Sequence, residues 1–513
     1  IKGVFSGTYV TRLEDGDLTT RKLDCIKSMT TPQQPGYILP ETSWHAFIGA
    51  PTGNGDCGSL MLAQTPLGPI ILGIHVMGGG NEVFSLPLNQ DIVQEGLKHF
   101  AEPHMEPTPP RLDVPNFETP LLDLHHKSVM RYIEDGTARV YGSFTGFKQA
   151  PKSHVKPTFV SEIVQAQCDI PVKTTKPQMS GYAPWRIAAV EMVKPVMDIN
   201  ADVLAECVAS YTDDILSGLS ADDLAEIMVY DDMTAINGAA GVQFVDKMNR
   251  NTSAGFPFKK GKKNFLTPCE GPPGSEWVHP DPVIMETLEE IHRLYMSGCR
   301  ASPVFNGHLK DEAVTHAKAK IGKTRVFTGA PFPWSIMNRK YLLAVTRVLQ
   351  RNRYVWEGMP GMNAMSKEWE EFYQYIVQHG VDRIIGGDYR FFDKQMPPTI
   401  VLGAFDVLRN ICKAAGFTLE DLMCIQGIAE DTAFSFVDFN GDLVEFFGTN
   451  PSGHPLTVII NGIANALYVR MCYHILNPDR EVRSFKKNIA LGTYGDDNLM
   501  GVSKRTPWFT HTT

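Results

Sequence analysis

The proline-rich stretch AEPHMEPTPPRLDVPNFETP, residues 101–120, separates two parts of the chain whose hydrophobic patterns differ. Before it, short apolar runs alternate with Gly, Pro and Asn turns, as in GPIILGIHVMGGGNEVFSLPL, which is typical of an all-β unit. Closely spaced prolines fix φ and remove backbone donors, so this stretch is predicted to be a linker. The sequence therefore predicts a multidomain protein.

After the linker, the chain contains long amphipathic segments accompanied by short strand-like runs such as DRIIGGDY and NIALGTYG. The segments with helical spacing are 200–229, 282–297, 335–352, 366–378 and 455–476. Helices mixed with a few antiparallel strands predict an α+β domain. We predict one domain at 1–102, a linker with the start of the second unit at 103–150, and the second domain at 151–513.

Composition narrows the class of protein. The nine cysteines are scattered and form no CxxC pair, which argues against a disulfide framework or a zinc ribbon and for a reducing compartment. No apolar run reaches the length of a membrane span, so we predict no transmembrane segment. The net charge of −9 argues against non-specific nucleic-acid binding, although KKGKK at 259–263 and the strip 309–325 are basic.

Paired carboxylates stand at the ends of two strand-like runs. Asp496 and Asp497 interrupt LGTYGDDNLMGV and are predicted at the tip of a hairpin, while Asp388 and Asp393 follow DRIIGG. Neighbouring carboxylates repel unless a cation lies on them, and Mg²⁺ favours one or two carboxylates plus phosphate oxygens. We therefore predict that Asp388 and Asp496 face each other across a pair of Mg²⁺ ions, an arrangement that suits phosphoryl transfer.

Polar residues between these two carboxylate sites are candidates for substrate contact. Thr457 and Asn461 lie four residues apart on one face of a predicted helix that follows the Ser452–Gly453 loop. They could contact a ribose or a template base, or simply satisfy the start of the helix. The basic strip offers positive charge to a pyrophosphate leaving group. Its cations are Lys310, Lys318, Lys320, Lys323 and Arg325.

A cysteine in a glycine-rich turn marks the first unit. Cys57 lies in GNGDCGSL, and His75 follows in GIHVMGGG. The backbone N–H groups of Gly55, Asp56 and Cys57 could hold an oxyanion, and the thiol could be a nucleophile if an imidazole lay nearby. The alternative is a cysteine in a tight turn without a catalytic role.

Three motifs in order, GGDYRFFD, NPSGHPLTVIINGIAN and TYGDD, resemble motifs A, B and C of RNA-dependent RNA polymerases of picorna-like viruses, in the dicistrovirus-like or marnavirus-like branch. NTSAGFPF resembles the template-entry motif of that family, LKDE…GKTR its motif F, and GMNAMSKEW a further family stretch. The resemblance covers roughly residues 250–502. It implies a right-hand polymerase of which this chain holds the fingers and palm but not the thumb.

The same resemblance assigns roles to individual residues. It implies that Asp388 and Asp496 bind the catalytic Mg²⁺ ions, for which Mn²⁺ could substitute, with Asp497 as a further metal ligand. It also implies that the ribose 2′-hydroxyl is contacted by a network of Asp393, Ser452, Thr457 and Asn461. The triphosphate would be bound by Lys310, Lys323 and Arg325, and the entering template by Ser253 and Gly255. The implied partners are an RNA template and primer, NTPs and other viral replication proteins.

The first unit resembles the C-terminal barrel of the chymotrypsin-like cysteine proteases of picornaviruses. The resemblance implies that Cys57 is the nucleophile acting on a viral polyprotein and that His75 lines the pocket for a P1 glutamine or glutamate. The family places its general base on an N-terminal barrel, for which the residues before Cys57 are too few; His45 is the only upstream histidine, at the wrong separation. We therefore expect a partial protease, and a piece of a longer polyprotein. Conceivable P1 residues in the chain are Gln94, Gln149 and Gln167.

These observations predict a viral RNA polymerase that transfers a nucleotide from an NTP to an RNA 3′-hydroxyl, fused to part of a cysteine protease. We expect it in the host cytoplasm, at membrane-associated replication complexes reached through partners. One alternative is a catalytically incomplete precursor that binds RNA or proteins. A reverse transcriptase also bears an Asp pair, but Gly495, Asp393 and Asn461 argue against it. A two-metal phosphatase would need a water-positioning base, for which the sequence offers no candidate.

Overall fold

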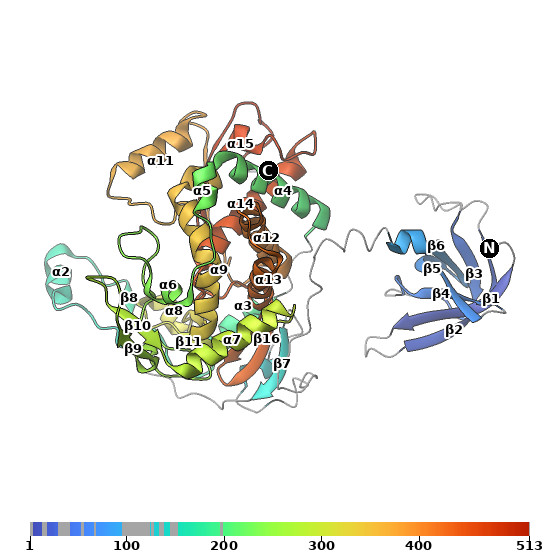
Figure 1. The fold of residues 1–513 in the computed structure, drawn as a ribbon, viewed down its shortest axis with the longest axis horizontal. Helices are drawn as coiled ribbons and strands as arrows, with labels where there is room; N and C mark the ends of the chain where they lie inside the picture. The colour runs from blue at the N-terminus through green and yellow to red at the C-terminus, as the bar shows by residue number, and fades with distance from the viewer. Residues whose placement is uncertain are drawn as a thin grey trace. The chain divides into compact units, whose positions relative to one another are not determined.

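The computed structural model describes residues 4–12, 18–28, 42–52, 56–65, 68–94, 124, 128–132, 138–143, 152–194 and 199–511. The chain forms two compact units, residues 1–106 and 107–513, shown in Figure 1. Each has its own hydrophobic core. Among the described helices, none has both the length and the apolar character needed to cross a bilayer.

The first unit is a closed six-stranded barrel, which confirms the predicted all-β class. The strands pair antiparallel in the order β1-β2-β3-β6-β5-β4. Their bounds are β1 (Phe5–Arg12), β2 (Leu18–Ser28), β3 (Trp44–Ile48), β4 (Leu60–Thr65), β5 (Gly68–Gly79) and β6 (Glu82–Pro87). Side chains alternate between the barrel interior and solvent, so Tyr9, Leu23, Met61 and Val83 are buried together.

The second unit is built around a five-stranded sheet in the order β13-β11-β15-β16-β7. The strands are β7 (Ala138–Ser143), β11 (Val304–Leu309), β13 (Val326–Gly329), β15 (Phe434–Phe439) and β16 (Asp442–Phe447). β11 and β15 run parallel and the other pairs antiparallel. β7 comes from the segment predicted to link the two domains. The described part of that segment is packed into the second unit, because Val129 and Met130 lie in its core and the Ser128 hydroxyl donates to Asp442 at 2.5 Å.

A second, three-stranded sheet has the order β14-β18-β17 and carries the carboxylate hairpin. Its strands are β14 (Ile384–Gly387), β17 (Ile489–Tyr494) and β18 (Asp497–Val502). The predicted hairpin is thereby confirmed. Helix α14 (Thr457–Leu476) packs against β17. α14 is apolar all round and largely buried, so it forms part of the core itself.

Long helices surround both sheets (Figure 1). They are α4 (Ala201–Gly218), α7 (Pro282–Met296), α9 (Phe332–Arg351), α11 (Lys367–Val377), α12 (Pro398–Ala414) and α13 (Leu419–Ala433). The segment 200–229, predicted to have helical spacing, contains two successive helices. α4 ends at Gly218, and Ser220 then caps α5 (Ala221–Ala225) through a reciprocal pair of hydrogen bonds with Asp223.

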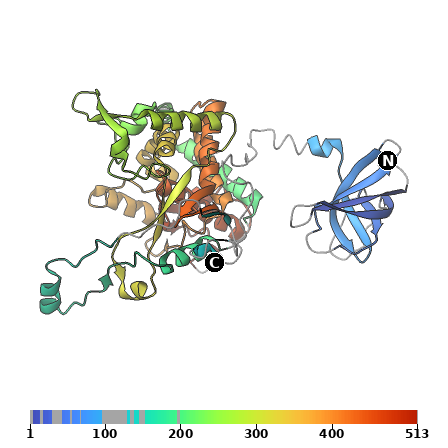
Figure 2. The same ribbon diagram turned by 90° about the horizontal axis from the view of Figure 1, so that it is seen from below.

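The remaining elements are short or peripheral. They are η2 (Val129–Tyr132), α2 (Ser161–Cys168), β8 (Thr174–Thr175), α3 (Ala183–Met192), α6 (Asp232–Asn237), η3 (Lys262–Phe265), β9 (Leu266–Cys269), β10 (Trp277–Pro280), β12 (Val314–Thr315), α8 (His316–Lys320), α10 (Arg353–Trp356) and α15 (Phe485–Asn488). Helix α2 projects from the second unit and buries none of its residues (Figure 2).

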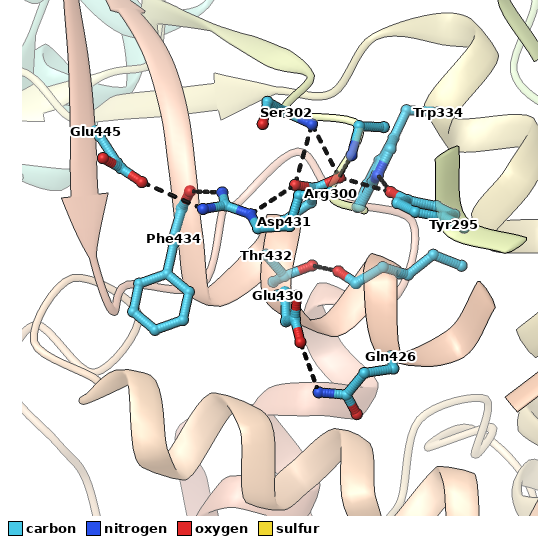
Figure 3. Close-up of polar contacts among 12 residues, drawn as sticks. Tyr295, Arg300, Ser302, Trp334, Gln426, Glu430, Asp431, Thr432, Phe434 and Glu445 are labelled. Carbon is cyan, nitrogen blue, oxygen red and sulfur yellow. Dashed lines mark hydrogen bonds and ion pairs between the residues drawn. The ribbon is translucent and has the colours of Figure 1, made fainter. Parts of the chain in front are cut away.

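A buried ionic cluster joins the five-stranded sheet to α13 (Figure 3). The Arg300 guanidinium donates to Asp431 at 3.0 Å and to Glu445 at 3.2 Å, and also to the carbonyl of Phe434. Asp431 in turn accepts the Tyr295 hydroxyl at 2.7 Å. Because these side chains are almost wholly buried, removing one partner would leave an uncompensated charge.

Candidate active site

The three-stranded sheet brings its acidic residues to one end. Gly387 of β14 pairs with Asn498 of the antiparallel strand β18. Asp388, directly after β14, and Asp497, at the start of β18, therefore lie at the same end of the sheet. Asp496 lies at the tip of the hairpin between β17 and β18, next to Gly495, whose φ of +65° makes the turn. Burial, Asp496 and Asp388 raise the pKa of Asp497. The carboxylates are therefore close enough to repel one another.

A cavity of 460 Å³ lies beside this end of the sheet, and five cations line it among apolar and acidic side chains. Asp393, Asp496 and Ser452 line it, together with the basic side chains Lys310, Lys318, Lys323, Arg325 and Lys394. Glu312 holds Lys310 at 3.0 Å and Arg325 at 3.5 Å. The three predicted triphosphate residues, Lys310, Lys323 and Arg325, thus lie around one cavity that Asp496 also lines.

Asp393 is linked to the start of α14 through Asn450. The backbone carbonyl of Asp393 accepts the Asn450 N–H at 2.7 Å, and the Asn450 side chain donates to Asn461 Oδ1 at 2.8 Å. Burial raises the pKa of the Asp393 carboxyl, although Lys394 and Arg325 act in the opposite direction. The Thr457 hydroxyl donates to the carbonyls of Pro451 and His454. Thr457 and Asn461 therefore hold the loop that carries Ser452 and do not themselves line the cavity.

That loop lies directly on β13. Ser452 Oγ accepts the Thr328 N–H at 3.4 Å, and a Cβ on Gly453 would lie 2.5 Å from the Thr328 carbonyl oxygen, so only glycine allows this approach. His454 is buried behind the loop, and burial lowers its pKa to about 3. A neutral imidazole can accept the Leu456 N–H at 2.8 Å. The loop is thus fixed from both sides.

A second cavity, of 640 Å³, contains the predicted template-entry residues. Ser253 and Gly255 line it with the basic side chains Lys262 and Arg339. Gly255 has φ +76°, and a Cβ there would lie 2.9 Å from Pro331 Cα. Burial lowers the pKa of Lys262 and brings that of Arg339 to about 10. Two cations therefore line this cavity beside the predicted template-entry residues.

Asp388 lines a different, smaller cavity of 290 Å³ with Tyr389, Cys472 and His511. Within the described ranges, no three His, Cys, Asp or Glu side chains form a complete set of metal ligands. The donor set at the sheet end nevertheless suits Mg²⁺, because this ion usually takes one or two carboxylates and completes its shell with water and phosphate oxygens. Asp497, whose pKa is raised by burial and by the two neighbouring carboxylates, and Asp496, which lines the cavity with the cations, fit that requirement.

Several residues of the site escape prediction from the sequence. Glu312, Lys394 and Asn450 hold predicted residues in place. Asn465 donates to backbone carbonyls at the hairpin tip. Asn465 follows Asn461 by four residues and shares its helical face, and this spacing is a signal that could have revealed it.

In the barrel, Cys57 is exposed on the turn before β4, with Sγ 3.8 Å from the Val76 carbonyl oxygen. Behind it, His75 is buried edge-on against Tyr9, with ring centroids 5.3 Å apart, and burial lowers the pKa of His75. The Tyr9 hydroxyl donates to the Asp56 carbonyl, and the Asp56 carboxylate pairs with Arg21 at 2.9 Å. Of the predicted oxyanion residues, Gly55 lies outside the described residues.

His45 lies apart from this arrangement. Its Nε2 is 3.5 Å from Glu82 Oε1, and its ring packs against Phe47 and Phe84. Burial lowers its pKa. In the part of the chain that the structure describes, no histidine hydrogen-bonds the Cys57 thiol.

The fold of the second unit is that of a viral RNA polymerase. It resembles the solved structure titled Sicinivirus 3Dpol RNA dependent RNA polymerase, with a TM-score of 0.55 and 18% identity over 70% of each chain. The family model described as "Viral RNA-dependent RNA polymerase" matches residues 194–512, and the chain belongs to that family.

Curated relatives extend the similarity to both units. The chain is 26% identical to the replicase polyprotein of Drosophila C virus (strain EB), over 99% of the chain and 31% of that polyprotein. It is also 26% identical to the RNA1 polyprotein of Cowpea mosaic virus (strain SB), over 98% of the chain and 26% of that polyprotein. The chain thus spans less than a third of the length of these relatives.

Proposed function

We propose that the second unit transfers a nucleoside monophosphate from an NTP to an RNA 3′-hydroxyl, on an RNA template, with release of pyrophosphate. The observation that carries this proposal is the pairing of β14 with β18, which brings Asp388, Asp496 and Asp497 to one end of a sheet beside a cation-lined cavity. Bound Mg²⁺ would supply Lewis-acid stabilisation to the reacting phosphate oxygens, and these three carboxylates are the residues that would hold it.

Each remaining contact follows from the chemistry of the substrate. Lys310, Lys323 and Arg325 would bind the triphosphate through charge-assisted hydrogen bonds. Asp393 would accept the ribose 2′-hydroxyl, held in position by Asn450 and Asn461. The second cavity, with Lys262, would receive template phosphates, so RNA affinity would fall with rising salt.

A primer-extension assay tests the proposal. The assay is run on the purified chain and on the chain together with any sequence that flanks it in its gene. Asp496→Ala is expected to lower the extension rate roughly a hundredfold or more. Asp479→Ala, an exposed aspartate after α14, is the matched control and should leave the rate unchanged. Chelation of divalent cations should abolish extension, and incorporation of dNTPs in place of NTPs would identify a reverse transcriptase instead.

The alternative, a catalytically incomplete precursor, makes a different prediction. Such a protein would retain RNA in a salt-dependent way but would add no nucleotide with Mg²⁺ or Mn²⁺. If the purified protein behaves in this way both alone and with its flanking sequence, nucleotidyl transfer is the wrong assignment. We also propose that the protein acts in the host cytoplasm, at membrane-associated complexes to which other replication proteins recruit it.

For the first unit, we propose a part in cysteine endopeptidase action on a viral polyprotein. The exposed thiol of Cys57, beside the buried Tyr9–His75 pair, supports this proposal. In a cleavage assay on a polyprotein substrate, with flanking sequence included, Cys57→Ala should abolish cleavage and His75→Ala should weaken discrimination for P1 glutamine. Cys25→Ala, at another exposed thiol of the barrel, is the control. Cleavage that survives Cys57→Ala would contradict the proposal.

A further inference from the structure

A buried amide on α14 holds the tip of the carboxylate hairpin. Asn465 is fully buried, and its Nδ2 lies 3.1 Å from the carbonyl oxygen of Gly495, 2.9 Å from that of Asp496 and 3.3 Å from that of Asp497. Three consecutive carbonyls therefore converge on one side-chain donor.

A second amide fixes the orientation of the first. Asn465 Oδ1 accepts the Asn498 Nδ2 at 3.1 Å, so the donating end of Asn465 must face the three carbonyls. The opposite orientation would set an oxygen against three oxygens and leave Asn498 facing a second donor. This orientation gives both polar atoms of the Asn465 amide a partner, and it defines where the turn lies relative to α14.

The same pair contacts the strand that precedes Asp388. A Cβ added to Gly387 would lie 2.6 Å from Asn498 Oδ1 and 2.9 Å from Asn498 Nδ2, so the Asn498 side chain lies directly over this glycine. Gly387 immediately precedes Asp388, and Asn498 immediately follows Asp497. The two amides, one on α14 and the other on β18, therefore lie against the backbone beside every carboxylate of the site.

We propose that Asn465 and Asn498 are positioning residues, an amide clamp that sets the spacing of Asp388, Asp496 and Asp497 for divalent-cation binding. Mg²⁺ demands near-ideal octahedral geometry, so a small displacement of one carboxylate weakens binding. Groups that orient metal ligands typically change metal affinity or activity about 10- to 100-fold when removed. An amide suits the position because an aspartate there would repel the three carbonyls. The clamp's role in catalysis rests on the proposed polymerase function, whereas its role in shaping the hairpin does not.

Two measurements on the protein without RNA test the clamp. Mn²⁺ binding is followed by the electron paramagnetic resonance signal of the free ion, and backbone hydrogen exchange is followed across residues 489–502. Asn465→Ala and Asn465→Asp should weaken Mn²⁺ binding about 10- to 100-fold. They should also speed exchange in the hairpin roughly tenfold, while exchange in β15 and β16 stays unchanged.

The matched control is Asn488→Ala, which also removes a buried amide that donates to the Tyr473 hydroxyl. Asn488 directly precedes β17, at the opposite end of that strand from the hairpin tip. It should cost similar stability and leave Mn²⁺ affinity intact. Gly387→Ala perturbs the clamp from β14 with Asn465 present, so it should reproduce the Mn²⁺ defect. Because both changes act through Asn498, the double variant should lose less than the product of the two single losses.

The outcomes separate this proposal from the proposed function. In primer extension, the Asn465 variants should lower kcat with little change in KM for NTP. Two results would contradict the amide-clamp proposal even if primer extension is intact. One is unchanged hairpin exchange and Mn²⁺ affinity in well-folded Asn465→Ala protein; the other is an equal loss of Mn²⁺ affinity in Asn488→Ala. If the wild-type protein adds no nucleotide, the polymerase proposal fails, and the two binding and exchange measurements still decide the clamp.

Discussion

At the scale of single residues, Glu430 is the most unusual carboxylate of the core. It is buried on α13, where Oε1 accepts the Gln426 amide at 3.0 Å and Oε2 has no hydrogen-bond partner (Figure 3). The nearby Arg300 is engaged by Asp431 and Glu445, so it compensates the charge of Glu430 only weakly. Burial raises the pKa of Glu430 to about 7.

This shift predicts a pH dependence of stability. Between pH about 4.5 and about 7, the folded protein keeps a proton on Glu430 that the unfolded chain has lost, so stability falls as pH rises through this window. Glu430→Gln cannot ionise and should therefore be more stable than the wild type at pH 8, by roughly 1–3 kcal/mol, and about equal at pH 5. Urea unfolding at both pH values measures this. Glu289→Gln, on an exposed stretch of α7, is the control, and an equal gain at pH 5 would contradict the assignment.

A site residue can be predicted from the sequence when its side-chain type alone indicates its chemical role. Asp388 and the Asp496–Asp497 pair were expected at strand ends. Asp388 follows β14, Asp496 lies in the β17–β18 turn and Asp497 begins β18. Asn465 was not assigned, because its partners are backbone carbonyls, which every residue carries. The roles expected of the site residues as ligands stay predictions for the experiments above.

At the scale of elements, side-chain caps that can be recognised in the sequence fix where helices begin. Thr418 begins α13 with a capping box: its hydroxyl accepts the Asp421 N–H, and the Asp421 carboxylate accepts the Thr418 N–H. The helix carries Glu430 and Asp431 at its other end, so its start and the buried ionic cluster belong to one rigid element.

Thr418→Ala should therefore lower the free energy of unfolding by about 1 kcal/mol, because it leaves an N–H at the helix start without its side-chain acceptor. Chemical denaturation measures the loss. Thr287→Ala on α7, where an exposed hydroxyl only donates back to the Val283 carbonyl, should change stability by less than about 0.5 kcal/mol. Equal effects of the two changes would show that the cap contributes nothing.

Element-scale prediction fails where a partner is distant in sequence. Helical periodicity indicated α7, α9, α11 and α14, whose bounds lie close to the predicted segments. α13 and the β15–β16 hairpin are buried on several sides and show no single apolar face. α12 has an apolar face but was not among the predicted segments. The pairing of β16 with β7 joins residues about 300 positions apart, and no local pattern encodes such a pairing.

At the scale of the whole molecule, the two units have separate cores. The barrel core contains only residues of β1 to β6, and the largest core of the second unit begins at Leu124. Structures with independent cores unfold as independent cooperative units when little surface joins them.

We therefore expect two calorimetric transitions, each sensitive to its own core. Leu23→Ala should destabilise the barrel by about 2–5 kcal/mol and move only one transition, whereas Ile428→Ala should move only the other. A single transition that responds to both substitutions would show that the units unfold together.

The edge strand β7 constrains where proteolytic processing can divide such a chain. It pairs with β16, and the buried residues Val129 and Met130 precede it. Cleavage after Gln167, on α2, or after Gln149, which lies outside the described residues, would leave this strand attached to the rest of the second unit by noncovalent contacts alone. Cleavage after Gln94, which lies in a helical turn, would keep the strand on the same polypeptide as the sheet it completes.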